Sequence, residues 1–135
     1  MSRGLRNCNP GNIRINGDKF QGEIIPSKDK SFKQFTSMAY GYRAMFAVLD
    51  TYRKKGLNTI EKVIRSWAPP SENNTQNYID SVVKWSGVSK DSILTEHSGA
   101  NYIKIVAAMS RMENGVEAIM GDVIAGFDLQ NRIMR

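Results

Sequence analysis

The sequence predicts a single α+β domain, with a small antiparallel sheet near the N-terminus and a helical bundle after it. The chain has 135 residues, of which 41% are hydrophobic, and this suits one domain with a single core over residues 1–135. Residues 12–35 alternate between apolar and polar, whereas the later residues carry apolar side chains at helical spacing. No internal repeat or low-complexity linker separates the two parts.

Residues 12–35 predict the sheet. Apolar and polar side chains alternate along this segment, and the pair Asn16-Gly17 is typical of the tight turn of a β-hairpin. The stretch from Phe32 to Phe35 predicts a further short strand. We therefore expect a hairpin that turns at Asn16-Gly17, with one more strand beside it.

Five helices are predicted after the sheet, each from its apolar spacing and its end signals. Gly56 and Gly115 end the first and the fourth of them, and Pro69 ends the second. Asn58, followed by Glu61 three residues later, is typical of a capping box, and we expect it to open the second helix. The expected ranges are 39–54, 58–67, 75–85, 100–113 and 117–124.

Composition argues against several classes of protein. The only cysteine, Cys8, cannot form an internal disulfide, and one cysteine offers no metal-binding cluster, so we expect no metal. No run of about 18 apolar residues is present. The first residues lack the apolar core of a signal peptide. We therefore expect neither a membrane span nor a secretion signal, so another factor must deliver the protein if it acts outside the cytoplasm.

The net charge of +6 favours a polyanionic partner. A cell-wall polymer and a nucleic acid both fit this description, and a basic surface that only keeps the protein soluble fits equally well. The sequence has no helix-turn-helix signature and no basic-aromatic strand pattern. Nucleic acid therefore ranks last among the candidate partners.

Glu113 is the candidate acid of a catalytic site. It shares one face of the predicted helix 100–113 with apolar residues that include Tyr102, Val106 and Met109. The negative end of the helix dipole and these apolar neighbours both disfavour a charged carboxylate there. A carboxylic acid that keeps its proton near neutral pH is what the cleavage of a glycosidic bond requires. The alternative is a solvent-facing glutamate at a frayed helix end, or one paired with Arg111.

Four motifs carry a resemblance to known families. They are "RGLRNCNPGNIR" at 3–14, "SFKQF" at 31–35, "GYRAMFAVLDTY" at 41–52 and "WAPPSENNTQNYI" at 67–79. Together they resemble small phage and prophage proteins described as virion structural proteins or endolysins. Their order is also similar to the part of the bacterial N-acetylglucosaminidase autolysins that follows the catalytic glutamate. In those lysozyme-like enzymes an alanine-rich helix ending in glutamate comes first, whereas here "AAMSRMENG" at 107–115 resembles that helix and follows the other motifs.

The resemblance implies a lysozyme-like fold in circular permutation, which neighbouring termini at the surface allow. It also implies cleavage of peptidoglycan glycan strands, with Glu113 as general acid and with Tyr78 and Glu72 near it in the active site. Amide and aromatic side chains suit N-acetylated sugars, and those expected to bind the substrate are Asn7, Asn9, Asn12, Trp67, Asn73 and Asn74. The alternatives are a tight turn at residues 7–12, and an N-cap at Asn74 or Thr75 on a helix whose Tyr78 is a core residue.

Two schemes can complete the reaction. A second carboxylate, Glu72 or Glu23, activates water or stabilises the oxocarbenium ion, or else the N-acetyl or 6-hydroxyl group of the substrate attacks. Neither scheme needs a metal or an organic cofactor. The rival interpretation is a non-catalytic virion structural or glycan-binding protein of the same fold. We expect a monomer unless it is assembled into a virion, located in the phage particle or delivered from the host cytoplasm to the periplasm and cell wall.

Overall fold

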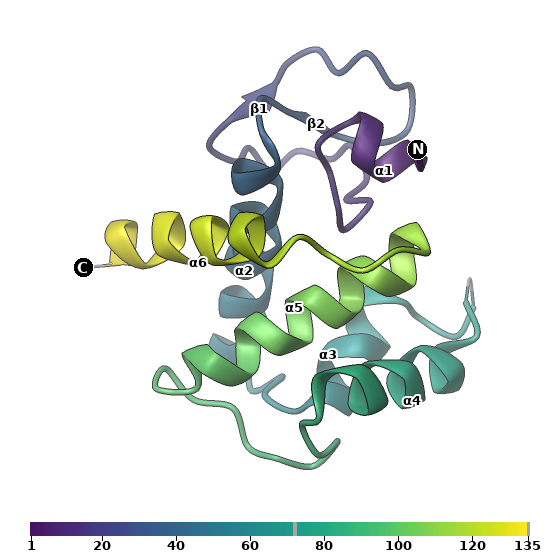
Figure 1. The fold of residues 1–135 in the computed structure, drawn as a ribbon, viewed down its shortest axis with the longest axis vertical. Helices are drawn as coiled ribbons and strands as arrows, with labels where there is room; N and C mark the ends of the chain where they lie inside the picture. The colour runs from purple at the N-terminus through teal and green to yellow at the C-terminus, as the bar shows by residue number, and fades with distance from the viewer. Residues whose placement is uncertain (72, 135) are drawn as a thin grey trace.

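A central helix connects two lobes in the computed structural model, which describes residues 1–71 and 73–134 (Figure 1). We call residues 1–37 the sheet lobe and residues 55–115 the helical lobe. The elements are, in order, α1 (Arg3–Arg6), β1 (Glu23–Ile24), β2 (Gln34–Phe35), α2 (Met38–Lys54), α3 (Ile60–Trp67), α4 (Thr75–Ser86), α5 (Gly99–Asn114) and α6 (Met120–Met134). Helix α2 joins the lobes, and α6 packs across it. The predicted α+β class is confirmed.

The sheet consists of two short antiparallel strands. β1 and β2 pair with Glu23 opposite Phe35. A further contact joins Arg14 to Phe32 as an isolated antiparallel bridge. The strand expected from Phe32 to Phe35 is therefore regular only at its last two residues.

The hairpin predicted at Asn16-Gly17 is wrong. The tight turn typical of this pair needs a positive φ at both residues, and neither Asn16 nor Gly17 is among the described residues with positive φ. The Asn16 Oδ1 instead accepts a hydrogen bond from the amide of Asp18. The chain therefore forms a loop after Asn16, and β1 begins only at Glu23.

Helix α2 forms where the apolar spacing predicts it. Its N-cap is Ser37, whose hydroxyl accepts a hydrogen bond from the amide of Tyr40. On the predicted apolar face, Tyr42, Met45 and Leu49 are buried, and Met38 and Tyr52 are partly buried. The helix ends at Lys54, and Gly56 follows with a φ of 85°, a conformation that favours glycine.

The three helices of the helical lobe also agree with the prediction, apart from one cap. The capping box expected at Asn58 is wrong, because Thr59 is the N-cap of α3 and its hydroxyl accepts a hydrogen bond from the amide of Lys62. The Asn58 carbonyl serves a different purpose and accepts a hydrogen bond from the amide of Leu94. Gly115 ends α5 in the left-handed conformation, as predicted.

The last helix differs most from the prediction. It was expected over 117–124, and α6 runs from Met120 to Met134. A Cβ atom at Gly126 would lie 2.6 Å from the Cβ of Tyr42, so the glycine is what lets α6 approach α2 this closely. Phe127 then packs edge to face on Phe46, with 5.3 Å between the ring centroids. Glycine inside a helical pattern weakens the prediction of a helix, although here glycine serves the packing.

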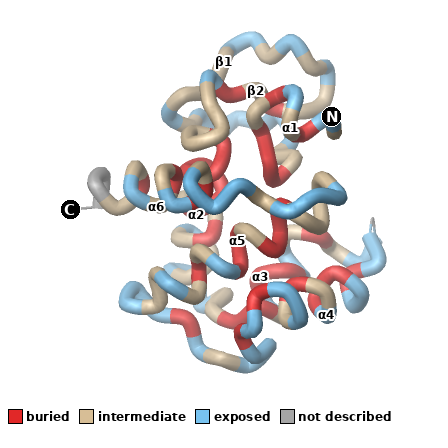
Figure 2. Tube along the Cα trace, viewed as in Figure 1, coloured by how far each residue is buried: buried red, intermediate tan, exposed pale blue. Residues whose placement is uncertain are grey.

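The apolar core lies in the helical lobe and along α2 (Figure 2). The sheet lobe buries polar side chains as well, above all Asn9 and Lys33, both of which are 0% exposed. None of the described helices is both long enough and apolar enough to cross a lipid bilayer.

Candidate active site

A buried amide shapes the asparagine-rich turn of the sheet lobe. The Asn9 Nδ2 donates to the carbonyl oxygens of Ile13 and Lys33, and the Asn9 Oδ1 accepts from the amide of Ile13. These bonds join the turn to the segment that leads into β2. Asn12 has a φ of 50°, which asparagine tolerates better than most residues. The turn thereby presents the Asn12 side chain to the end of α5.

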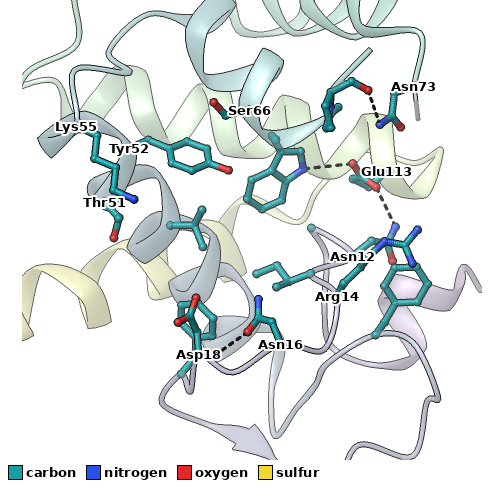
Figure 3. A pocket seen from close by; sticks show the side chains of 18 of the residues that line it. Asn12, Arg14, Asn16, Asp18, Thr51, Tyr52, Lys55, Ser66, Asn73 and Glu113 are labelled. Atoms are coloured by element: carbon teal, nitrogen blue, oxygen red, sulfur yellow. Dashed lines mark hydrogen bonds between the residues drawn. The ribbon is translucent and has the colours of Figure 1, made fainter. Parts of the chain in front are cut away.

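Glu113 lies in the last turn of α5, where three side chains donate hydrogen bonds to its carboxylate. The Asn12 Nδ2 lies 3.0 Å from Oε1, and the Trp67 Nε1 lies 3.4 Å from Oε2 (Figure 3). The Tyr78 hydroxyl lies 2.8 Å from Oε2. All three donors are neutral, and no described cation forms an ion pair with Glu113. Hydrogen bonds therefore orient the carboxyl group, and no described cation lies close enough to form an ion pair with it.

Tyr78 belongs to the core and to the site. Its residue is only 5% exposed, and its ring packs in the core of the helical lobe, while its hydroxyl reaches Glu113. Burial, followed by the charge of the nearby Glu113, raises the pKa of Tyr78 well above its usual value. The hydroxyl consequently keeps its proton at physiological pH and remains a hydrogen-bond donor.

Asn114, which the sequence reading missed, joins the sheet lobe to α5 next to Glu113. Its Nδ2 donates to the carbonyl oxygens of Pro10 and Ser110, and its Oδ1 accepts a hydrogen bond from the hydroxyl of Ser2. Gly4 completes this contact, since a Cβ there would lie 2.5 Å from the Asn114 Oδ1. This amide therefore holds the asparagine-rich turn in register with Glu113. The only signal in the sequence was its place beside the candidate acid.

Glu113 opens onto a cleft of about 950 Å³ between the two lobes (Figure 3). Four aromatic side chains line it, namely Phe20, Phe32, Tyr52 and Trp67. The other lining residues are Gly11, Asn12, Ile13, Arg14, Asn16, Asp18, Lys19, Val48, Thr51, Lys55, Ser66, Ala68, Pro69 and Asn73. A wall of aromatic faces, amides and hydroxyls suits a chain of N-acetylated sugars, and the open shape can admit a polymer.

The structure brings together several of the predicted site residues. Tyr78, Trp67 and Asn12 meet at Glu113, and Asn73 lines the same cleft. Asn12 and Tyr78 both contact Glu113, although Tyr78 does not itself line the cleft. The catalytic and binding roles of these residues stay predictions.

Three asparagines predicted to bind substrate do not line the cleft. The amide of Asn9 is wholly buried and bonded to backbone. The Asn7 Nδ2 donates to Asp29, and Asn74 is the N-cap of α4, where its side chain accepts from the amide of Asn77. Short polar side chains often satisfy nearby backbone groups in this way. The wholly buried Asn9 therefore cannot contact a substrate directly, whereas substrate contact by Asn7 and Asn74 stays a prediction.

The structure describes only one of the two candidates for a second carboxylate. Glu72 lies outside the described residues. Glu23 accepts hydrogen bonds from the buried Lys33 Nζ at 3.0 and 3.1 Å and does not line the cleft, so its proposed catalytic role is not supported. Asp18 does line the cleft, beside Asn16 (Figure 3). Among the described residues, no three metal-ligating side chains lie close enough together to hold an ion.

Comparison with known proteins relates the chain to a phage protein. No protein-family model matches it. It is 38% identical, in an alignment 132 residues long, to Protein P5 of Pseudoalteromonas phage PM2, and the match covers 94% of this chain and 81% of that protein. Identity at this level over nearly the whole chain indicates common descent.

Proposed function

Because this chain belongs to the same family as Protein P5 of Pseudoalteromonas phage PM2, we propose that it serves a phage. From the geometry around Glu113, and not from this relative, we further propose that it does so by cleaving the glycan strands of bacterial peptidoglycan. Glu113 is the general acid in this proposal, and it protonates the glycosidic oxygen of the bond that breaks. The fold is the lysozyme-like fold that the sequence motifs imply, in circular permutation. No metal and no organic cofactor take part.

One observation carries the proposal: the Glu113 carboxyl group, which accepts hydrogen bonds from three neutral donors, lies at the wall of a cleft of about 950 Å³. A structural glutamate at a helix end often pairs with a cation, and Glu113 forms no ion pair among the described residues. Protonation of a leaving group by a positioned side chain accelerates a reaction by about 10² to 10⁴. The orientation of Glu113 supplies the positioning that such a transfer needs.

The three donors have separate tasks. Tyr78 and Trp67 both bind Oε2, so they hold one edge of the carboxyl group against the helical lobe. Asn12 binds Oε1 from the sheet lobe. After proton transfer the resulting carboxylate accepts all three hydrogen bonds, which stabilise the charge that has developed.

The position of the first residues supports the permutation. The Ser2 hydroxyl bonds to Asn114, the residue that directly follows Glu113. In space, the asparagine-rich turn thus continues from the end of α5, although the chain reaches it from the N-terminus (Figure 1). This is the order of elements in the autolysins, where the turn follows the helix that bears the glutamate.

Digestion of purified peptidoglycan by the wild-type protein tests the proposal. We expect fragments whose mass and end groups correspond to glycan cleavage. Reducing ends identify hydrolysis by water, and anhydro ends identify attack by the 6-hydroxyl group of the substrate. Release of peptides with intact glycan strands would contradict a glycosidase.

A second candidate is a non-catalytic virion component that binds glycan or contributes to assembly. The comparison favours this candidate over the first, since the relative is a phage protein whose name states no enzymatic activity. Such a protein would retain the cleft and bind glycan strands without producing fragments. The same digestion, combined with a sedimentation assay for binding to insoluble peptidoglycan, separates the two candidates.

A further inference from the structure

A second pocket, which we call the small pocket, lies where α2, α6 and the start of α5 meet. Its volume is about 120 Å³, against about 950 Å³ for the cleft. The edge-to-face rings of Phe46 and Phe127 both line it. Pockets for drug-sized ligands are larger than this, so the small pocket suits one side chain or a small molecule.

The small pocket and the cleft lie on opposite faces of α2. Phe46, Asp50 and Arg53 line the small pocket. The cleft is lined from the same helix by the residues two positions further on, namely Val48, Tyr52 and Lys55. Two positions turn an α-helix by about 200°. A strand bound in the cleft therefore lies on the other side of α2, and the small pocket must serve a different ligand.

Two buried polar groups in the small pocket have no partner. Four buried side-chain nitrogen or oxygen atoms form no hydrogen bond within the described part of the chain, and two of them are the Tyr102 hydroxyl and the Gln130 Oε1. Both residues line the small pocket, and they are only 8% and 9% exposed. A hydroxyl rotates about its C–O bond and the last torsion of glutamine is broad, so both groups can turn toward the pocket. A buried group without a partner costs free energy, and a ligand that bonds to it removes this cost.

The charged groups of the small pocket neutralise one another. The Arg53 Nη2 lies 2.5 Å from the Asp50 Oδ1, and the Arg53 Nη1 lies 3.9 Å from the Glu96 Oε2. An anionic ligand would have to displace these carboxylates, and a cationic ligand would meet the guanidinium. The two groups that lack a partner, on Tyr102 and Gln130, are neutral. A neutral ligand therefore fits the small pocket best.

The unpartnered groups also define which atoms the ligand must carry. The Gln130 Oε1 only accepts hydrogen bonds, so the ligand needs a donor. Burial raises the pKa of Tyr102, so its hydroxyl keeps its proton and can donate to an acceptor of the ligand. Further donors lie at the start of α5, because its N-cap Ser98 makes no capping hydrogen bond with its side chain and Gly99 lines the small pocket. The ligand therefore carries a donor and an acceptor close together.

We propose that the small pocket binds the primary amide of an asparagine or glutamine side chain, presented by a partner protein. The amide nitrogen donates to the Gln130 Oε1, and the amide oxygen accepts from the Tyr102 hydroxyl. The methylene groups pack on Phe46 and Phe127. A primary amide carries its donor and acceptor together at the end of the side chain, whereas the trans secondary amide of an N-acetyl sugar directs them to opposite sides. The inference does not depend on glycan cleavage.

Titration of the ¹⁵N-labelled whole chain with small probes of equal size tests the proposal. The probes are propanamide, N-methylacetamide, propanoate and butylammonium, which represent a primary amide, a secondary amide, an anion and a cation. The backbone amide signals of Gly99 and Phe127 report on the small pocket, and that of Gly11 reports on the cleft. We expect propanamide to shift the first two signals with a Kd of about 1 to 10 mM. Each of the other probes should bind there at least about fivefold more weakly.

Two conservative variants locate the binding and separate it from a structural role. Tyr102→Phe and Gln130→Met each remove one unpartnered group, so propanamide should bind about fivefold more weakly to either. Neither variant should lower the melting temperature, because neither group has a hydrogen bond to lose. Tyr42→Phe is the matched control, since its hydroxyl is bonded to Ser110. It should melt at a lower temperature and bind propanamide within about twofold of the wild type.

The proposal is overturned if propanoate, butylammonium or N-methylacetamide shifts the Gly99 and Phe127 signals at a lower concentration than propanamide does. N-acetylglucosamine that binds there more tightly than propanamide would overturn it in favour of a sugar. A lowered melting temperature in Tyr102→Phe would show that the hydroxyl serves the fold. Unchanged propanamide affinity in both variants, or no shift of the two signals with propanamide, would show that the small pocket is not an amide site.

Discussion

The two lobes are stabilised in different ways, and the candidate site lies where they meet. In the helical lobe, apolar side chains such as Ile79 and Met109 are almost completely buried and form a continuous core. In the sheet lobe, the buried Asn9 and Lys33 instead bond to the backbone and to Glu23. The site takes Glu113 from the first lobe and Asn12 from the second.

This difference indicates how each lobe should respond to change. Apolar packing depends on volume and is insensitive to pH, whereas buried hydrogen bonds and ion pairs fail when one partner is removed or changes its charge. Substitutions should therefore destabilise the sheet lobe more easily than the helical lobe. A destabilised sheet lobe should in turn alter the hydrogen bonding of Glu113, because Asn12 and Asn114 connect the two.

The largest effect on stability is expected from Lys33→Met. It leaves the Glu23 carboxylate buried without its cation, which costs about 3 to 5 kcal/mol of unfolding free energy. The measurement is urea unfolding followed by circular dichroism, together with amide exchange to locate the loss in the sheet lobe. Lys30→Met, at an exposed position of the same lobe, is the matched control and should change little. A loss that the double variant K33M/E23L does not partly restore would contradict the ion-pair explanation.

A smaller effect is expected from Asn114→Ala. The substitution removes the hydrogen bonds to Pro10, Ser110 and Ser2, so it should cost about 1 to 3 kcal/mol and loosen the turn that carries Asn12. Glycan cleavage should fall further than in Asn77→Ala, a control at an exposed position of α4. If Asn114→Ala loses the expected stability but cleaves glycan as well as the control does, the contact is structural only.

Acid should weaken the sheet lobe through Asp29. Its hydrogen bonds with the Arg3 guanidinium and then the Ser31 amide hold the pKa of the Asp29 carboxyl well below its usual range. A lowered pKa means that the carboxylate contributes its full stability above the ordinary carboxyl pKa of about 4, and that this contribution is lost as the pH falls below that value. Urea midpoints measured from pH 7 to pH 2 should therefore fall more for the wild type than for Asp29→Asn. Parallel curves for the two proteins would show that Asp29 is not the cause.

The smallest effect on stability is expected from Tyr78→Phe. It keeps the core ring and removes only the hydroxyl that bonds to Glu113, so we expect a loss of about 1 kcal/mol. Cleavage should fall by less than the about hundredfold expected when a general acid is removed. Tyr42→Phe is the matched control, since it removes a comparable buried bond, to Ser110, and should leave cleavage unchanged. Equal cleavage by both variants would leave Tyr78 with only a core role.

The same contrast decides how far the sequence could predict the fold. Apolar spacing predicts α2, α4 and α5 well, because their faces are buried against the core as the pattern implies. In the sheet lobe, the alternation along residues 12–35 predicts more strand than β1 and β2 contain, and the hydrogen bonds made by Asn9 and Lys33 leave no repeating pattern in the sequence. Helix α6 was misjudged for a related reason, since Gly126 disfavours a helix locally but allows close packing on Tyr42.

The site could be predicted in part for similar reasons. Glu113 and Tyr78 both lie on helices whose buried faces are predicted by the apolar spacing. Asn12 was one of several asparagines in a single motif. Which of these asparagines reaches the cleft depends on hydrogen bonds between their side chains and the backbone, and these bonds form only in the folded chain. The contact of Asn114 with Ser2 joins residues that are 112 positions apart, so local patterns in the sequence cannot predict it.

The most direct test of the central claim is cleavage of purified peptidoglycan by Glu113→Gln. The substitution keeps the shape of the side chain but removes the proton that it donates. We expect cleavage to fall by about a hundredfold or more, with glycan binding retained and with a melting temperature that is unchanged or raised. Glu96→Gln, at an exposed position that does not line the cleft, should cleave as the wild type does. Cleavage by Glu113→Gln at the wild-type rate would contradict the assignment of Glu113 as the general acid.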